Sequence, residues 1–255
     1  PPLSFGQSAR RQSFHWLSYQ RIREEFQEKK IVWAYTSEIV RQKMGLPSLQ
    51  QAFATIEAEG YRKAIVQPLH IFPATEYNEL SELCYKYPNI RVVMGETLLH
   101  RWQFVHEVLK IVEADFLPVG EGVNLLVAHG TPMCADPANI IYQGLYTYLP
   151  QKYENVFLAT VDGMPDREVA LKNLPRAKRV RLLPFMYLAG IHVEKDLLGP
   201  SASFKTALEA LGFETDWPVV TNGNERLVKA LGLYDEVWQC FVERIKRALT
   251  LMQYF

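Results

Sequence analysis

Three apolar, β-branched runs in the second half of the chain each end close to a side chain that can bind a metal. The side chains are His129, Asp162 and His192, and they are 33 and 30 residues apart. This spacing is close to the ~30 or more residues of one strand–helix–strand unit. Because the carboxyl ends of parallel strands meet at one edge of an open α/β sheet, the spacing predicts that the three side chains converge there. The runs cover residues 123–127, 156–161 and 180–184.

The same alternation of apolar runs and amphipathic segments extends along the whole chain and predicts an α/β fold. In the second half, strands are expected around Leu125, Leu158, Leu182 and Val219, with helices at residues 137–148, 166–174 and 201–211. In the first half, strands are expected at residues 31–35, 63–69 and 90–94, and helices at residues 8–29, 38–44, 48–60, 76–87 and 100–114. A parallel sheet flanked by helices is the usual solution for such alternation.

The chain is expected to form two lobes. Residues 116–122 contain one Pro and two Gly and are the best candidate for a linker. This predicts two similar α/β lobes, residues 1–117 and 118–233, each with a parallel sheet. A last helix at residues 234–255 carries an apolar stripe along one face, and it is expected to join the first lobe.

Composition excludes several classes of protein. Lys plus Arg and Asp plus Glu number 28 each, so no global field draws the chain to nucleic acid or to an anionic membrane. No apolar run approaches the ~18–20 residues that span a bilayer. The three cysteines are far apart in sequence, which fits neither a disulfide framework nor a thiolate metal site. Motifs for nucleotide binding, serine hydrolysis and dithiol redox chemistry are absent.

Imidazole and carboxylate groups together suit borderline divalent ions such as Co²⁺, Ni²⁺, Fe²⁺ and Zn²⁺. A set of two histidines and one carboxylate leaves coordination positions open, whereas structural sites are usually closed. His129, Asp162 and His192 therefore indicate catalysis or delivery of a metal. The alternative is that each side chain only caps a strand or makes a buried hydrogen bond. His70 follows a strand of the first half, where it could contact a substrate, take a proton or be structural.

Five groups of short motifs follow one another along the chain: Ser4-Phe5-Gly6, Ala34-Tyr35-Thr36-Ser37, Gln67-Pro68-Leu69-His70-Ile71 with Glu76-Tyr77, Ala128-His129-Gly130, and Leu183-Pro184-Phe185-Met186 with Ala189-Gly190-Ile191-His192. In this order they resemble the anaerobic, single-subunit sirohydrochlorin cobalt chelatases of the CbiK type. The resemblance covers nearly the whole chain. It implies a class II chelatase fold, with a tetrapyrrole cleft between two α/β lobes.

The resemblance also implies roles for individual residues. His129 and His192 would be catalytic and would bind the metal together with Asp162, which stands where the family has a glutamate. His70 and Glu76 would contact the substrate. The expected reaction is that of a lyase of cobalamin biosynthesis, which inserts Co²⁺ into a tetrapyrrole such as sirohydrochlorin. Fe²⁺ and Ni²⁺ are alternative ions. No cofactor would be permanently bound, because the metal is itself a substrate.

The sequence also bears on partners and compartment. The alternative function is an exported protein of the same fold that binds haem or another iron tetrapyrrole with weak or no chelatase activity. A cytoplasmic protein is expected, although the sequence begins as if clipped, and an exported protein or surface lipoprotein is the alternative. A membrane anchor would have to lie in residues missing before Pro1. The expected partner is a tetrapyrrole and not nucleic acid, and a homo-oligomer remains open.

Overall fold

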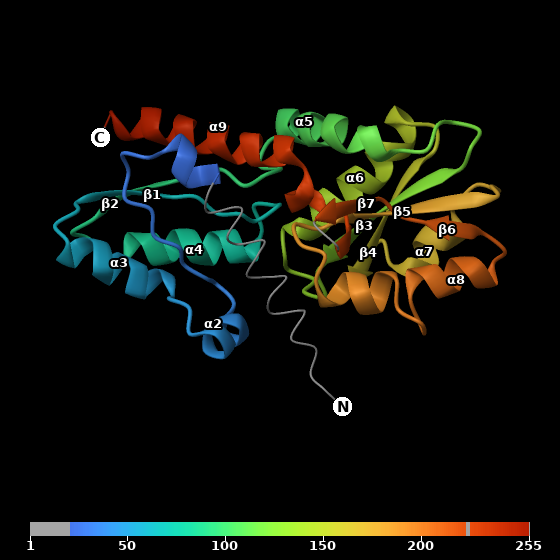
Figure 1. Cartoon of the computed structure of the whole chain (residues 1–255), viewed down its shortest axis with the longest axis horizontal. Helices are drawn as coiled ribbons and strands as arrows, with labels where there is room; N and C mark the ends of the chain where they lie inside the picture. Colours follow the sequence, from blue (N-terminus) through green and yellow to red (C-terminus); the bar gives the residue numbers. More distant parts are fainter. Residues whose placement is uncertain (1–20, 223–224, 255) are drawn as a thin grey trace. The chain divides into compact units, whose positions relative to one another are not determined.

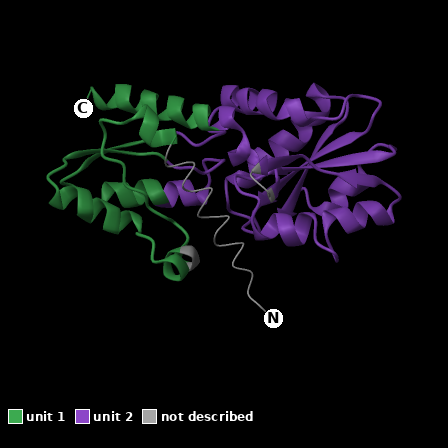
Figure 2. Ribbon diagram, viewed as in Figure 1, with its two compact units in different colours: residues 1–67, 80–95, 238–255 green, residues 68–79, 96–237 purple. Residues whose placement is uncertain are grey.

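A computed structural model describes residues 21–222 and 225–254, which fall into two compact units (Figure 2). Unit 1 comprises residues 1–67, 80–95 and 238–255, and unit 2 comprises residues 68–79 and 96–237. The motif Ser4-Phe5-Gly6 and most of the helix expected at residues 8–29 lie outside the described residues. The division into lobes after residue 117 stays a prediction. All five site residues expected from the sequence belong to unit 2.

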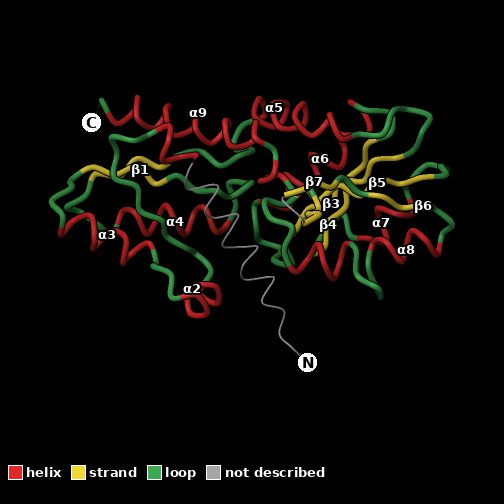
Figure 3. The backbone as a smooth tube through the Cα atoms, viewed as in Figure 1, coloured by secondary structure: helices red, strands yellow, loops and turns green. Residues whose placement is uncertain are grey.

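Unit 2 is built on a four-stranded parallel sheet with the strand order β4-β3-β5-β6 (Figures 1 and 3). The central strand β3 (Val123–Gly130) pairs in parallel with both β4 (Val156–Asp162) and β5 (Arg179–Phe185). The short strand β6 (Glu214–Asp216) extends the sheet beyond β5. The carboxyl ends of β3, β4 and β5 therefore share one edge, as the sequence predicts.

Helices cover both faces of this sheet. Figure 1 shows α5 (Trp102–Val112) and α6 (Ala138–Lys152) on one side, and α7 (Arg167–Lys172) and α8 (Phe204–Ala210) on the other. Leu125 and Leu182, at the centre of the sheet, are fully buried. Burial of one such side chain contributes about 1.5–3 kcal/mol. The near-continuous apolar sequence of β3 and β5 follows from burial on both faces.

The strand expected around Val219 does not join the parallel sheet. Residue 219 begins β7 (Val219–Asn222), which pairs antiparallel with β8 (Glu225–Val228) as a separate two-stranded sheet. The fourth parallel strand is β6 instead. Extended sequence alone does not specify the pairing partner, so the prediction was right about conformation and wrong about the sheet.

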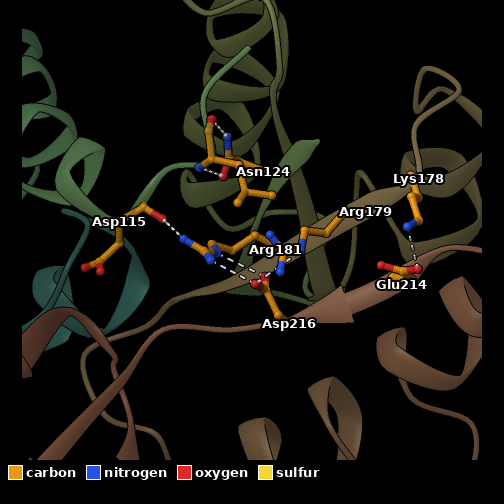
Figure 4. Close-up of polar contacts among 8 residues, drawn as sticks. Asp115, Asn124, Lys178, Arg179, Arg181, Glu214 and Asp216 are labelled. Carbon is orange, nitrogen blue, oxygen red and sulfur yellow. Dashed lines mark hydrogen bonds and ion pairs between the residues drawn. The ribbon is translucent and has the colours of Figure 1, made fainter. Parts of the chain in front are cut away.

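Charged side chains fix β6 to the amino end of β5 (Figure 4). Arg181 Nε and Nη2 donate to the two carboxylate oxygens of Asp216 at 3.0 and 2.8 Å, and Nη1 donates to the Asp115 carbonyl at 3.1 Å. Lys178 and Glu214 form a second ion pair across the two strands at 3.2 Å. These contacts lie at the amino end of β5, whereas His192 follows its carboxyl end.

Unit 1 contains a smaller parallel sheet, formed in the described residues by β1 (Lys63–Val66) and β2 (Arg91–Met94). Its core is centred on the buried residues Phe53, Cys84 and Ile90. Its helices are α2 (Glu38–Met44), α3 (Leu49–Ala58), the later part of α4 (Thr75–Tyr85) and most of α9 (Asp235–Met252).

Two features of the first half refine the sequence interpretation. Ser48 caps α3 in a capping box with Gln51, in agreement with the predicted helix start. Residues 31–35 are not a strand; the Tyr35 N–H donates to the Pro47 carbonyl at 3.0 Å, outside any sheet. Apolar and aromatic side chains there favour an extended chain, but no strand within residues 21–222 and 225–254 pairs with it. Among the described helices, none combines the length and apolar character needed to cross a membrane.

Candidate metal centre

The two histidines expected at the sheet edge come together. His129 is the penultimate residue of β3, and His192 immediately precedes a π-helical turn at Val193–Leu197 that follows the loop after β5. Their Nε2 atoms are 3.1 Å apart, and their ring planes are inclined at 79°. The side chain of His192 is about one-third exposed, and His129 is exposed. The pair is therefore accessible from solvent.

Each histidine is held through its other ring nitrogen. His129 Nδ1 lies 3.0 Å from the Gly130 carbonyl oxygen, and His192 Nδ1 lies 2.9 Å from Asp196 Oδ2. A carbonyl or carboxylate oxygen can only accept a hydrogen bond, so we assign the proton to Nδ1 in both neutral rings. Both Nε2 atoms then direct lone pairs toward each other. Two such acceptors cannot bond to one another, but a cation between them would satisfy both.

The separation of the two nitrogens suits a single metal ion. With metal–nitrogen bonds of about 2.0–2.1 Å, nitrogens at this separation subtend an angle of roughly 95–100° at the ion. Such an angle is typical of neighbouring ligands in octahedral or distorted tetrahedral coordination. Imidazole Nε2 binds metals only when unprotonated, and in a neutral ring an Nδ1–H···O contact leaves Nε2 as the nitrogen without a proton.

Asp162 is not brought into a three-ligand group with the histidines. Within residues 21–222 and 225–254, no cluster of three His, Cys, Asp or Glu side chains is arranged to hold a metal. Asp162 pairs with Gly130 in the β3–β4 register. Successive side chains of a strand point to opposite faces, so this register gives Asp162 the face of Gly130 and not that of His129. The assignment of Asp162 as a ligand stays a prediction.

His70 and Glu76, the expected substrate contacts, lie beside one another. His70 Nε2 is 3.4 Å from Glu76 Oε2, and the glutamate side chain is 75% exposed. Burial lowers the pKa of His70, and the charge of Glu76 opposes that shift. His70 Nδ1 is buried and has no hydrogen-bond partner among the described residues. His70 is therefore favoured in its neutral form.

A buried tyrosine connects this pair with the end of β3. Burial raises the pKa of Tyr142 to about 12, a hydrogen bond with the Gly130 backbone opposes the shift, and the charges of Asp136 and Glu76 add to it. The Tyr142 ring also packs on Phe72 at 5.0 Å between centroids. Glu76 thus acts electrostatically on the group that contacts the residue after His129.

Sequence reasoning did not identify Asp196 or Tyr142. For Asp196 a signal exists, because His192 and Asp196 are four residues apart and such residues are neighbours on a helix. It is weak, since the helix there is a single π-helical turn that no pattern indicates. Tyr142 occupies an ordinary core position of α6, and nothing in the sequence distinguishes it from other buried aromatic residues.

The parallel sheet of unit 2 thus carries two facing imidazoles at its carboxyl edge. A family model described as "Cobalt chelatase (CbiK)" matches residues 4–250. The chain therefore belongs to the cobalt chelatase CbiK family, and its class is that of a metal chelatase. This confirms the family expected from the sequence motifs.

Known proteins of two kinds are similar to this chain. The sirohydrochlorin cobaltochelatase CbiKC of Nitratidesulfovibrio vulgaris is 28% identical over 208 residues, which cover 76% of this chain and 72% of the relative. A structure of SirB from Bacillus subtilis with Fe³⁺ matches with a TM-score of 0.54 and 13% identity, covering 86% of this chain and 81% of that one. The sirohydrochlorin chelatase SirB from Bacillus subtilis subspecies spizizenii in complex with cobalt matches with a TM-score of 0.52 and 18% identity, covering 86% and 80%. These structural likenesses confirm the chelatase-like fold.

Proposed function

We propose that this protein inserts Co²⁺ into sirohydrochlorin. The observation that carries the proposal is the close approach of His129 Nε2 and His192 Nε2, which lie 3.1 Å apart. Membership of the cobalt chelatase family supports the reaction class, and the sirohydrochlorin cobaltochelatase relative supports the tetrapyrrole. The alternative of an exported haem-binding protein is not favoured, because neither comparison points to it.

Two imidazoles suit a metal that must be passed on. Structural zinc sites enclose the ion with four protein ligands, whereas sites that act on a metal keep positions open. An ion held by His129 and His192 would retain open positions for the pyrrole nitrogens of the incoming ring. Uptake of a divalent ion by the free base releases two pyrrole protons. Once the ion has left a histidine, its Nε2 lone pair is free to accept one of these protons.

A carboxylate would complete the ligand set and offset charge, and two residues are candidates. Asp162 is the residue implied by the family resemblance. Glu76 is largely exposed, and its charge acts on Tyr142 at the end of β3. We propose Glu76 as the carboxylate of the reaction, because the β3–β4 register gives Asp162 the opposite face of the sheet from His129. His70 would then orient Glu76 through its Nε2.

The proposal is tested by mixing the protein with Co²⁺ and sirohydrochlorin under anaerobic conditions and following the absorption spectrum of the tetrapyrrole. We expect insertion to be faster than the uncatalysed reaction, and slow in the protein in which His129 and His192 are both alanine. Parallel reactions with Fe²⁺ and Ni²⁺ report metal preference. Equal rates with and without the protein would contradict the proposal.

A further inference from the structure

We propose that Asp196 is a positioning residue that holds His192 in the tautomer and orientation needed to bind the incoming metal. The inference rests on the proposed function and extends it to a residue outside the expected ligand set. Asp196 Oδ2 lies 2.9 Å from His192 Nδ1. Neutral imidazole can carry its proton on either nitrogen. The carboxylate selects Nδ1–H and leaves Nε2 free for the ion.

The backbone that carries Asp196 is fixed on both sides. Val193 and Leu197, which begin and end the π-helical turn, are 1% and 0% exposed and belong to the core cluster of unit 2. The turn is closed by the hydrogen bond from the Leu198 N–H to the Val193 carbonyl at 3.0 Å. Asp196 therefore projects from a short segment whose flanking side chains are anchored in the core.

A glycine allows this wide turn to close. At Gly199 a Cβ atom would overlap the carbonyl oxygen of Lys195. A side chain at position 199 would therefore push the backbone of residue 199 away from that of residue 195. That carbonyl belongs to the residue before Asp196. Single π-helical turns are rare in proteins, and many of those that occur are found at functional sites. Here the turn presents His192 at its start and a carboxylate four residues later, within hydrogen-bonding distance of the ring.

The two histidines are held by different kinds of acceptor. His129 Nδ1 uses the Gly130 backbone carbonyl at 3.0 Å, which no side-chain substitution removes. His192 depends on a side chain, so its orientation can be altered without touching a ligand. Loss of an outer hydrogen-bond partner of this kind typically reduces metal affinity or activity about 10- to 100-fold.

The test compares Asp196→Ala and Asp196→Asn with the wild-type protein and with Glu154→Gln. The control removes one negative charge from an exposed position of the same unit. Co²⁺ affinity is measured through the visible absorption of the bound ion. The tautomer of His192 is read independently from its ring ¹⁵N chemical shifts in the metal-free protein. We expect Asp196→Ala to weaken Co²⁺ binding about 10- to 100-fold and to shift the His192 nitrogens away from the Nδ1–H pattern.

The control should leave both measurements unchanged. Asp196→Asn keeps an acceptor but loses the charge, so we expect a smaller loss of affinity than for Asp196→Ala. Unchanged ¹⁵N shifts of His192 in Asp196→Ala would overturn the proposal, whether or not the Co²⁺ affinity changes. Unchanged Co²⁺ affinity in Asp196→Ala, when His192→Ala loses it, would overturn the positioning role alone. Unchanged affinity in His192→Ala would instead refute the proposed metal site.

Discussion

His129 and His192 are 63 positions apart in the chain, yet their Nε2 atoms lie 3.1 Å from each other. The parallel pairing of β3 with β5 brings them to one edge of the sheet. Each ring is fixed by a hydrogen-bond acceptor at Nδ1. Both partners of the close approach are therefore held in place by neighbouring groups.

Replacing either histidine should weaken metal binding without unfolding the protein. We expect His129→Ala and His192→Ala each to reduce Co²⁺ affinity by more than the 10- to 100-fold typical of an outer partner, because a direct ligand is lost. The melting temperature of the metal-free protein should change little, since surface substitutions usually cost less than about 0.5 kcal/mol. Titration with Co²⁺ and thermal unfolding provide the two readouts.

A matched control for this experiment is His106→Ala. His106 is exposed and bonds to the Tyr148 hydroxyl at 2.9 Å on the surface of α5 and α6. This variant should bind Co²⁺ like the wild type. Wild-type affinity in both His129→Ala and His192→Ala would rule out the pair as the metal centre.

The two candidate carboxylates can be separated by isosteric substitution. We expect Glu76→Gln to lower the rate of Co²⁺ insertion more than Asp162→Asn, because Asp162 pairs with Gly130 and so shares its face of the sheet, not that of His129. Steady-state insertion rates at saturating Co²⁺ provide the measurement. A larger effect of Asp162→Asn would restore Asp162 as the ligand implied by the family resemblance.

The turn after His129 requires glycine. Gly130 has φ of +76°, and a Cβ there would overlap the Asp162 carbonyl oxygen. A left-handed conformation alone costs about 1–2 kcal/mol for an L-residue, and the overlap adds to it. We expect Gly130→Ala to lower the free energy of unfolding by more than about 2 kcal/mol and to displace His129, as measured by denaturant unfolding and Co²⁺ affinity.

Gly144 provides the opposite case in the same unit. It lies within α6, is exposed, and a Cβ there would contact nothing. Gly144→Ala should therefore raise the free energy of unfolding by about 0.5–1 kcal/mol. Similar stability changes in Gly130→Ala and Gly144→Ala would mean that neither backbone conformation nor crowding matters at Gly130.

Stability should fall as the pH is lowered below about 6.5, the ordinary pKa of histidine. The folded protein lowers the pKa of His70 mainly through burial. Between the folded and unfolded pKa values the unfolded chain binds more protons, so acid favours unfolding. His70→Gln should reduce the dependence of the unfolding free energy on pH between 5 and 7, measured by denaturant titration. An unchanged slope would show that His70 is not responsible.

The alternation of parallel strands with helices and the convergence of the two histidines could be predicted from the sequence. The runs before His129 and Asp162 are apolar and are followed by Gly. Near-continuous apolar runs of this kind are typical of parallel strands that are buried on both faces. Spacing also predicts which strand ends share an edge. It does not predict on which face each side chain leaves the strand. For Asp162, one residue of register decides whether the carboxylate can join a histidine, so its place in the ligand set stays a prediction.

Other features were missed for reasons of pairing and turn geometry. The sequence contains Asn222-Gly223, and Asn-Gly is a common hairpin signal. The expectation of a parallel strand at Val219 disregards this signal, whereas β7 and β8 pair antiparallel. The π-helical turn that carries Asp196 depends on core packing of Val193 and Leu197, and these contacts are made in three dimensions. Local sequence therefore indicates the two converging histidines more readily than the residues that support them.

Unit 2 is discontinuous in the chain, and this governs how the protein can be shortened or recombined. His70 and Glu76 belong to it, although 16 residues assigned to unit 1 (80–95) separate them from the rest of the unit. A fragment beginning at residue 118 would keep both histidines and omit Glu76 together with α5. A chimaera that exchanges unit 2 between relatives should therefore transfer residues 68–79 together with residues 96–237. Its junctions then lie at the boundaries of the unit and not at the midpoint of the gene.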